Sequence, residues 1–235
     1  MGDALLLSYG GQALNLIAAA SKSADKLTYL IAQSFSGFRD TCVNSAGNQS
    51  YFYKRAQICV ADLWAAFKHK EPCDFTDIDA VTTFADYRIP QVRRMRARRR
   101  GAGRLERSRC LERLARSALL GTICDALQPL SPLAPLPSLT LASLMQLLRE
   151  LGVMVYSEEL ATRVDASMEI RAGSDEEIEI RAATVVCVER LVKEVTGLGQ
   201  RINAVQMDWW LWQTGEKLEL EGGLKPHHKV KTIFY

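Results

Sequence analysis

The sequence predicts a mainly α-helical fold, on the evidence of one apolar stripe at helical spacing and two capping-box motifs. The stripe lies at positions i, i+3, i+4, i+7, i+8 and i+11 of one segment, namely Ala56, Cys59, Val60, Leu63, Trp64 and Phe67. This spacing places the six side chains on one face of a helix. Sustained period-two alternation occurs only at 153–156 and 177–180, and a capped helix explains the second segment better.

The first capping box is Ser174-Asp-Glu-Glu177. Ser174 can accept a hydrogen bond from the Glu177 amide while Glu177 reaches back, and the acidic residues lie favourably at the positive helix end. We expect this helix to run to about Val195, with Gly197 beyond its end as a C-cap.

The second capping box pairs Asn203 with Gln206 and opens a helix expected to end before Gly215. Its apolar residues point in every direction, which predicts a central, buried helix. Earlier in the chain, Ala4–Leu7 and Ala24–Phe35 also have helical character, and the latter helix should end at Gly37.

The composition is that of a globular protein, with 48% apolar and 24% charged residues among 235. There is no run of eighteen uncharged apolar residues, and the segment 1–9 lacks the basic flank of a secretory signal, so we expect a cytoplasmic protein without a membrane segment. The six cysteines form no CxxC pair and are expected to be reduced. With no metal-binding motif, GxGxxG or P-loop, neither a metal nor a cofactor is predicted.

The segment 93–143 differs from the rest of the chain. Residues 93–116 hold eleven arginines and two glutamates, a net charge of +9 in a chain whose net charge is +3. Residues 129–138 hold four of the seven prolines, which cannot continue a regular helix. The arginines could bind RNA phosphates, but no aromatic residue is present to stack on bases, so a solvated, disordered insert is the favoured interpretation.

Several blocks resemble, in order, the queuosine 5′-phosphate N-glycosylase/hydrolase family. They are 35–40 (FSGFRD), 53–64 (YKRAQICVADLW), 75–78 (FTDI), 83–91 (TFADYRIPQ), 151–157 (LGVMVYS), 177–182 (EIEIRA), 202–212 (INAVQMDWWLW) and 226–235 (PHHKVKTIFY). The resemblance implies hydrolysis of the N-glycosidic bond of queuosine 5′-phosphate, which releases queuine for salvage into tRNA. It also implies a single helical domain similar to helix-hairpin-helix DNA glycosylases.

On this basis we expect residues 1–92 and 144–235 to be two parts of one helical domain, with 93–143 as an atypical insert that looks like intron or misjoined sequence. The family has a long segment before the position matching Met1, with pocket residues and a base-site histidine that we expect to be missing here. A catalytically impaired deazaguanine-binding remnant and an RNA-associating helical protein are therefore alternatives. We expect a monomer acting on a small molecule, without direct nucleic-acid contact.

Asp208 is the candidate catalytic residue. It lies on a helix too apolar to face water, and a buried carboxylate can stabilise an oxocarbenium-like transition state at the anomeric carbon. A structural ion pair with Arg88 or Arg181 would also explain its burial. The resemblance places the family's catalytic aspartate at Asp208.

Four further residues are candidates for substrate binding. The resemblance implies that Phe84 stacks on the deazaguanine base. It also implies that Asp86 accepts hydrogen bonds from the guanine-like edge of this base. The alternatives are core packing for Phe84 and a salt bridge with Arg88 for Asp86. Trp209 stands where the family usually has tyrosine, and its ring can still stack on the base. Gln213 stands where the family often has a second aspartate, and it could hydrogen-bond the ligand.

The C-terminal segment contains a cluster of basic residues that resembles the family's His-Arg-x-Arg terminus, comprising His227, His228, Lys229 and Lys231. It could contact the 5′-phosphate of the substrate. A solvated basic tail is the favoured alternative.

Overall fold

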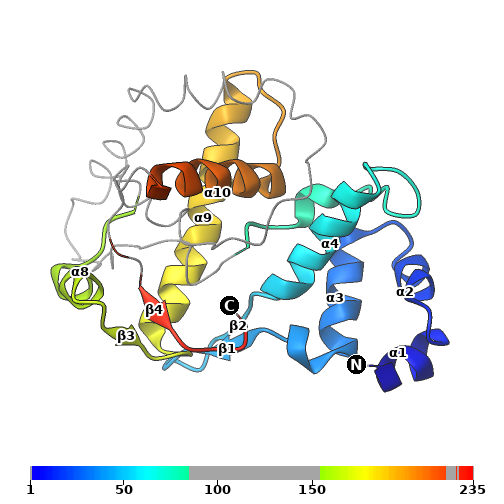
Figure 1. Cartoon of the computed structure of the whole chain (residues 1–235), viewed down its shortest axis with the longest axis horizontal. Coiled ribbons are helices and arrows are strands. Elements are labelled where there is room, and N and C mark those ends of the chain that lie inside the picture. Colours follow the sequence, from blue (N-terminus) through cyan, green and yellow to red (C-terminus); the bar gives the residue numbers. More distant parts are fainter. Residues whose placement is uncertain (1, 85–153, 221–225, 227, 235) are drawn as a thin grey trace.

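The computed structural model describes residues 2–84, 154–220, 226 and 228–234. In these residues the protein is mainly helical, as the sequence predicts, with seven α-helices and four strands of two or three residues (Figure 1). The segment 93–143 and Asp86 lie outside the described residues. No helix in the described parts of the chain is long and apolar enough to cross a membrane.

Four helices make up most of the N-terminal part: α1 (Gly2–Tyr9), α2 (Ala13–Ala19), α3 (Ala24–Ser34) and α4 (Lys54–Ala66). The helices expected at Ala4–Leu7 and Ala24–Phe35 are confirmed as α1 and α3, with the second ending at Ser34, whereas α2 was not predicted. The short η1 turn (Ser36–Phe38) follows α3, and the η2 turn (Ile78–Ala80) follows α4.

The predicted apolar stripe is confirmed on α4, which packs against α3 (Figure 1). Ala56, Val60 and Trp64 are buried in one core cluster with residues of α2 and α3. Phe67 lies just after the last helical residue and is 38% exposed. The last buried residue of the stripe is therefore Trp64.

Helix α9 (Asp175–Gly197) begins at the predicted cap. The Ser174 hydroxyl oxygen accepts from the Glu177 N–H at 3.3 Å, and the Glu177 carboxylate accepts from the Gly173 N–H at 2.9 Å. The predicted C-terminal end is wrong, because Gly197 still belongs to the helix. The glycine with a left-handed backbone is Gly199, with φ of +89°, a conformation that favours glycine.

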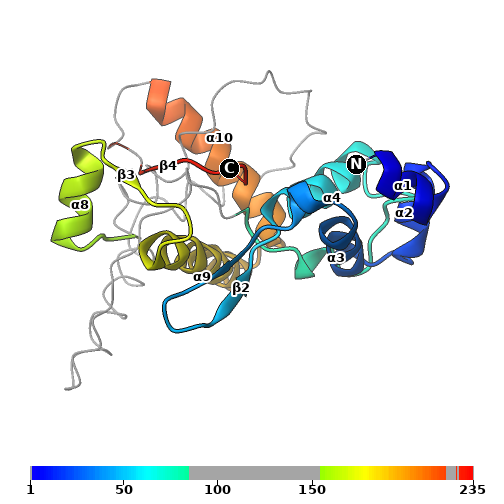
Figure 2. The same cartoon turned by 90° about the horizontal axis from the view of Figure 1, so that it is seen from below.

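Helix α10 (Ala204–Leu220) also begins as expected. The Asn203 side chain accepts from the Gln206 N–H at 2.9 Å, and the Gln206 side chain accepts from the Asn203 N–H at 3.1 Å. The expected end before Gly215 is wrong, because a glycine inside a helix costs only about 1 kcal/mol. Helix α10 packs against α9 and runs across it in the view of Figure 1, whereas Figure 2 shows that the N-terminal end of α10 lies at α9 and its other end points away.

The strands are too short to leave a periodic signal in the sequence. Strands β1 (Thr41–Val43) and β2 (Gln49–Tyr51) form an antiparallel hairpin. The Asn44 side-chain oxygen accepts from the Ala46 and Asn48 N–H groups at 3.1 and 2.9 Å and closes its turn.

A second pair of strands lies near the other end of the chain. Strand β3 (Glu169–Ile170) follows helix α8 (Glu158–Asp165) and pairs in parallel with β4 (Lys229–Val230). The residues 154–157 are not part of a strand, so the alternation noted at 153–156 does not correspond to one in its described part.

A buried salt bridge joins the N-terminal part to α9. Arg181 donates to both carboxylate oxygens of Asp40, one at 2.9 Å, and the side chains are 3% and 1% exposed. The Arg181 guanidinium also lies 3.9 Å from the centre of the Phe52 ring. The Asp40 carboxylate further accepts from the Lys54 N–H at 3.4 Å, so this ion pair also holds the start of α4.

Among the described residues, Cys42, Cys59 and Cys73 are free thiols. Burial raises the pKa of the Cys42 thiol to about 11, so this residue is protonated at neutral pH. Cys110 and Cys124 lie outside the described residues.

The Asp40–Arg181 pair predicts a large effect on stability. Asp40→Asn should lower the free energy of unfolding by about 3–5 kcal/mol, because it leaves a buried guanidinium without its main counter-ion. The control is Glu176→Gln, which removes a pair with Arg163 whose side chains are 41% and 29% exposed and should cost less than about 1 kcal/mol. Urea unfolding of both variants measures the difference, and equal effects would contradict the prediction.

The environment of Glu177 predicts that the stability of the protein depends on pH. Burial raises the pKa of its carboxyl above the ordinary value of 4.5, despite the attraction of Arg181. Ionisation of Glu177 therefore costs more in the folded than in the unfolded protein, and its contribution to stability falls as pH rises through the interval between the two pKa values. Glu177→Gln should accordingly gain stability relative to the wild type between pH 4 and pH 7. Urea unfolding at both pH values tests this, and a constant difference would refute it.

Candidate functional site

The candidate site is centred on the buried face of α10. Asp208 is 5% exposed, which confirms the burial expected from the sequence. Its helical neighbours Val205, Met207 and Leu211 are each at most 1% exposed. The carboxylate therefore lies in surroundings where charge is stable only if hydrogen-bond donors or positive charges surround it.

Two consecutive residues donate to one oxygen of Asp208. The Phe84 N–H lies 3.1 Å from Oδ1, and the Thr83 hydroxyl makes a short hydrogen bond to the same atom. Arg181, one of the ion-pair partners considered for Asp208, instead forms its salt bridges with Asp40 and Glu177. Arg88, the other, lies outside the described residues.

Phe84 is 6% exposed and belongs to the same core cluster as Val205 and Trp64. It thus has the packing role that the sequence left open as an alternative, while its backbone supports Asp208. Its proposed stacking on a base is an additional role that stays a prediction. Asp86 follows two residues later, outside the described part of the chain.

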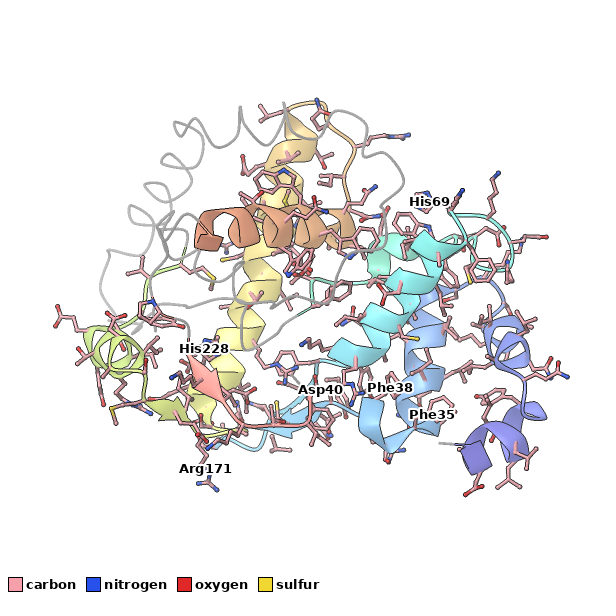
Figure 3. All side chains as sticks on the ribbon, viewed as in Figure 1. Phe35, Phe38, Asp40, His69, Arg171 and His228 are labelled. Atoms are coloured by element: carbon pink, nitrogen blue, oxygen red, sulfur yellow. The ribbon has the colours of Figure 1, made fainter. Side chains whose placement is uncertain are left out.

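Trp209 is partly buried and forms one layer of an aromatic stack. Its ring centre lies 6.4 Å from that of Trp64, with an angle of 24° between the planes. The His69 ring stacks on Trp64, with 3.8 Å between the ring centres and an angle of 13° between the planes. His69 lies at the C-terminal end of α4, away from Asp40 (Figure 3). Gln213 is also partly buried and lies one turn beyond Trp209 on α10.

The C-terminal basic residues do not behave as one group. Lys229 and Lys231 are exposed, and Lys231 pairs with Glu169 at 2.8 Å, as expected of a solvated tail. For His228 this expectation is wrong: its side chain is fully buried, with Nδ1 3.3 Å from the Tyr156 hydroxyl. His228 lies beside β4, far from His69 (Figure 3), and His227 lies outside the described residues.

Thr83 is the residue that sequence reasoning missed. It is 1% exposed, and its partner Asp208 is 125 positions further along the chain. The sequence block that contains Phe84 and Asp86 starts at Thr83. A local sequence pattern does not reveal a hydrogen bond between residues so far apart. The only indication in the sequence is that Thr83 is the first residue of the block that contains Phe84 and Asp86.

These residues define a helical protein in which a buried carboxylate accepts from two donors and the next residue of its helix, Trp209, belongs to a stack of aromatic side chains. The family model for the queuosine salvage protein matches residues 1–98 and 140–235, which flank most of the arginine- and proline-rich segment. The chain belongs to this family.

Similar curated proteins carry one name, queuosine 5′-phosphate N-glycosylase/hydrolase. The chain is 32% identical to that of Sphaerobacter thermophilus over 234 residues and 32% identical to that of Dictyostelium discoideum over 235 residues. It is 28% identical to that of Bos taurus over 242 residues. Each alignment covers 100% of this chain and 54–55% of the relative, so the chain spans about half the length of these proteins.

Proposed function

We propose that the protein hydrolyses the N-glycosidic bond of queuosine 5′-phosphate and releases queuine for salvage into tRNA. The observation that carries this proposal is the buried Asp208 carboxylate, which two donors from Thr83 and Phe84 hold in place. The family and the names of the curated relatives support the substrate.

The proposed reaction breaks the bond between the anomeric carbon of the ribose and the glycosidic nitrogen of the base. The bonding electron pair leaves with the base, which takes up a proton, and water supplies the hydroxyl group that bonds to the anomeric carbon. Positive charge develops on the sugar as the bond breaks. Asp208, as the catalytic residue, would stabilise this charge, because a carboxylate in buried surroundings interacts with it more strongly than in water.

Four residues would bind the substrate in this proposal. Phe84 and Trp209 would offer aromatic faces to the deazaguanine base, and Asp86 would accept from its ring N–H and exocyclic amine. Gln213, one turn from Trp209, would provide a further hydrogen bond.

Residues 1–92 and 144–235 would form one helical domain, similar to helix-hairpin-helix DNA glycosylases. The single domain is supported by Val205 of α10, because it shares a core cluster with residues of α2, α3 and α4. The protein would act in the cytoplasm as a monomer on a small molecule, without a cofactor and without direct contact with nucleic acid or membrane.

The proposal predicts the outcome of a single substitution. Asp208→Asn keeps an oxygen that can accept from Thr83 and Phe84 but removes the charge, so the rate of queuine release should fall by about 100-fold or more. Release from queuosine 5′-phosphate is measured by mass spectrometry. Asp25→Asn, a change at an exposed aspartate of α3, should leave the rate unchanged. A wild-type rate in Asp208→Asn would refute the catalytic role.

The two roles of Phe84 can be separated by Phe84→Leu. Leucine still fills the core, so the free energy of unfolding should fall by less than about 1.5 kcal/mol. Loss of base stacking, worth about 1–3 kcal/mol, should weaken queuine binding by about 5- to 150-fold. Calorimetric titration with queuine measures the affinity. Unchanged affinity would leave Phe84 with packing alone, and binding without any release by the wild type would favour the deazaguanine-binding alternative.

A further inference from the structure

The segment that holds Asp208 is itself fixed from a third element. Gln57 of α4 accepts from the Thr82 N–H at 2.7 Å through its side-chain oxygen, and its side-chain nitrogen donates to the Phe52 carbonyl at 2.8 Å. Val81 is 2% exposed, and Thr83 is 1% exposed. The Thr83 hydroxyl is thus carried by a buried backbone that is anchored immediately before it.

The chemistry of this contact is specific for a hydroxyl. An ionised carboxylate only accepts hydrogen bonds, so the Thr83 hydroxyl is the donor of the hydrogen bond to Asp208. Such a charge-assisted bond is stronger than one between neutral groups, and the β-branched side chain of threonine has few χ1 conformations. The threonine therefore orients the carboxylate as well as partly replacing the water lost on burial.

We propose that Thr83 is a positioning residue for hydrolysis: together with the Phe84 N–H, its hydroxyl holds the Asp208 carboxylate in the orientation that faces the anomeric carbon. This inference rests on the proposed function. It deepens that function because Thr83 immediately precedes Phe84 and lies three residues before Asp86, both proposed base ligands. One short segment would then set both the base position and the direction of the carboxylate.

The experiment compares Thr83→Val, which removes the hydroxyl at nearly constant shape, with Thr83→Ser, which keeps it. Losing a hydrogen bond to a charged group should lower kcat for queuine release by about 10- to 100-fold in Thr83→Val. KM and the affinity for queuine should stay within about twofold of wild type, because a positioning role acts on the transition state. Thr83→Ser should restore kcat to within about threefold of wild type.

Thr184→Val is the matched control, because Thr184 is also fully buried and its hydroxyl donates at 2.9 Å to the Ile180 carbonyl within α9. This variant should keep the wild-type kcat. If Thr83→Val does not fold, Thr83→Cys replaces it, and a kcat between those of the wild type and Asp208→Asn is expected from its weaker donor.

The outcomes separate this inference from the proposed function. An active wild type with equally active Thr83→Val overturns the positioning role alone. A low kcat in Thr83→Ser, or a parallel loss of queuine affinity in Thr83→Val, would indicate a general structural role and also overturns it. A wild-type chain that releases no queuine rejects the proposed function and, with it, the role of Thr83.

Discussion

A carboxylate that is removed from water needs donors, and Asp208 is the group on which the candidate site depends. Two donors among the described residues are Thr83 and Phe84, which precede it by 125 and 124 positions. The bonds therefore fix α10 against the segment that follows α4. Phe84 is held in two ways, because its ring packs in the core while its backbone N–H donates to Asp208.

Asp40 is a second buried carboxylate, and it is stabilised by the opposite charge of Arg181. Here a buried charge is neutralised by an opposite charge 141 positions away, and the Phe52 ring covers the guanidinium. This contact orients α9 against the hairpin and the start of α4, whereas the Asp208 contact orients α10. Because α9 and α10 pack against each other, the two buried carboxylates together determine where the site lies relative to the N-terminal helices.

The sequence predicted those elements that depend on interactions between residues close together in the chain. The caps at Ser174 and Asn203 and the stripe around Val60 follow from hydrogen bonds and spacing within one turn or one helix face, and the structure contains them. The prediction that α10 ends before Gly215 was wrong, because one glycine inside a helix costs only about 1 kcal/mol and does not by itself end the helix.

The features that the sequence did not reveal, inside the candidate site and outside it, depend on contacts between distant residues. The role of Thr83 and the burial of His228 are set by partners 125 and 72 positions away. Burial of Asp208 was predictable because its own helix is apolar on every side. Its partners were not, and the family resemblance came from whole blocks of sequence rather than from any one residue.

We propose that the Asp208 carboxylate faces the reacting carbon while the base lies on the segment that begins at Thr83. A crystal structure of the chain with bound queuine would show whether this is so. We expect the base to contact Phe84 and Trp209, with its glycosidic nitrogen turned toward Asp208 and with the hydrogen bonds from Thr83 and Phe84 intact. Queuine bound elsewhere, or with this nitrogen directed away from Asp208, would contradict it.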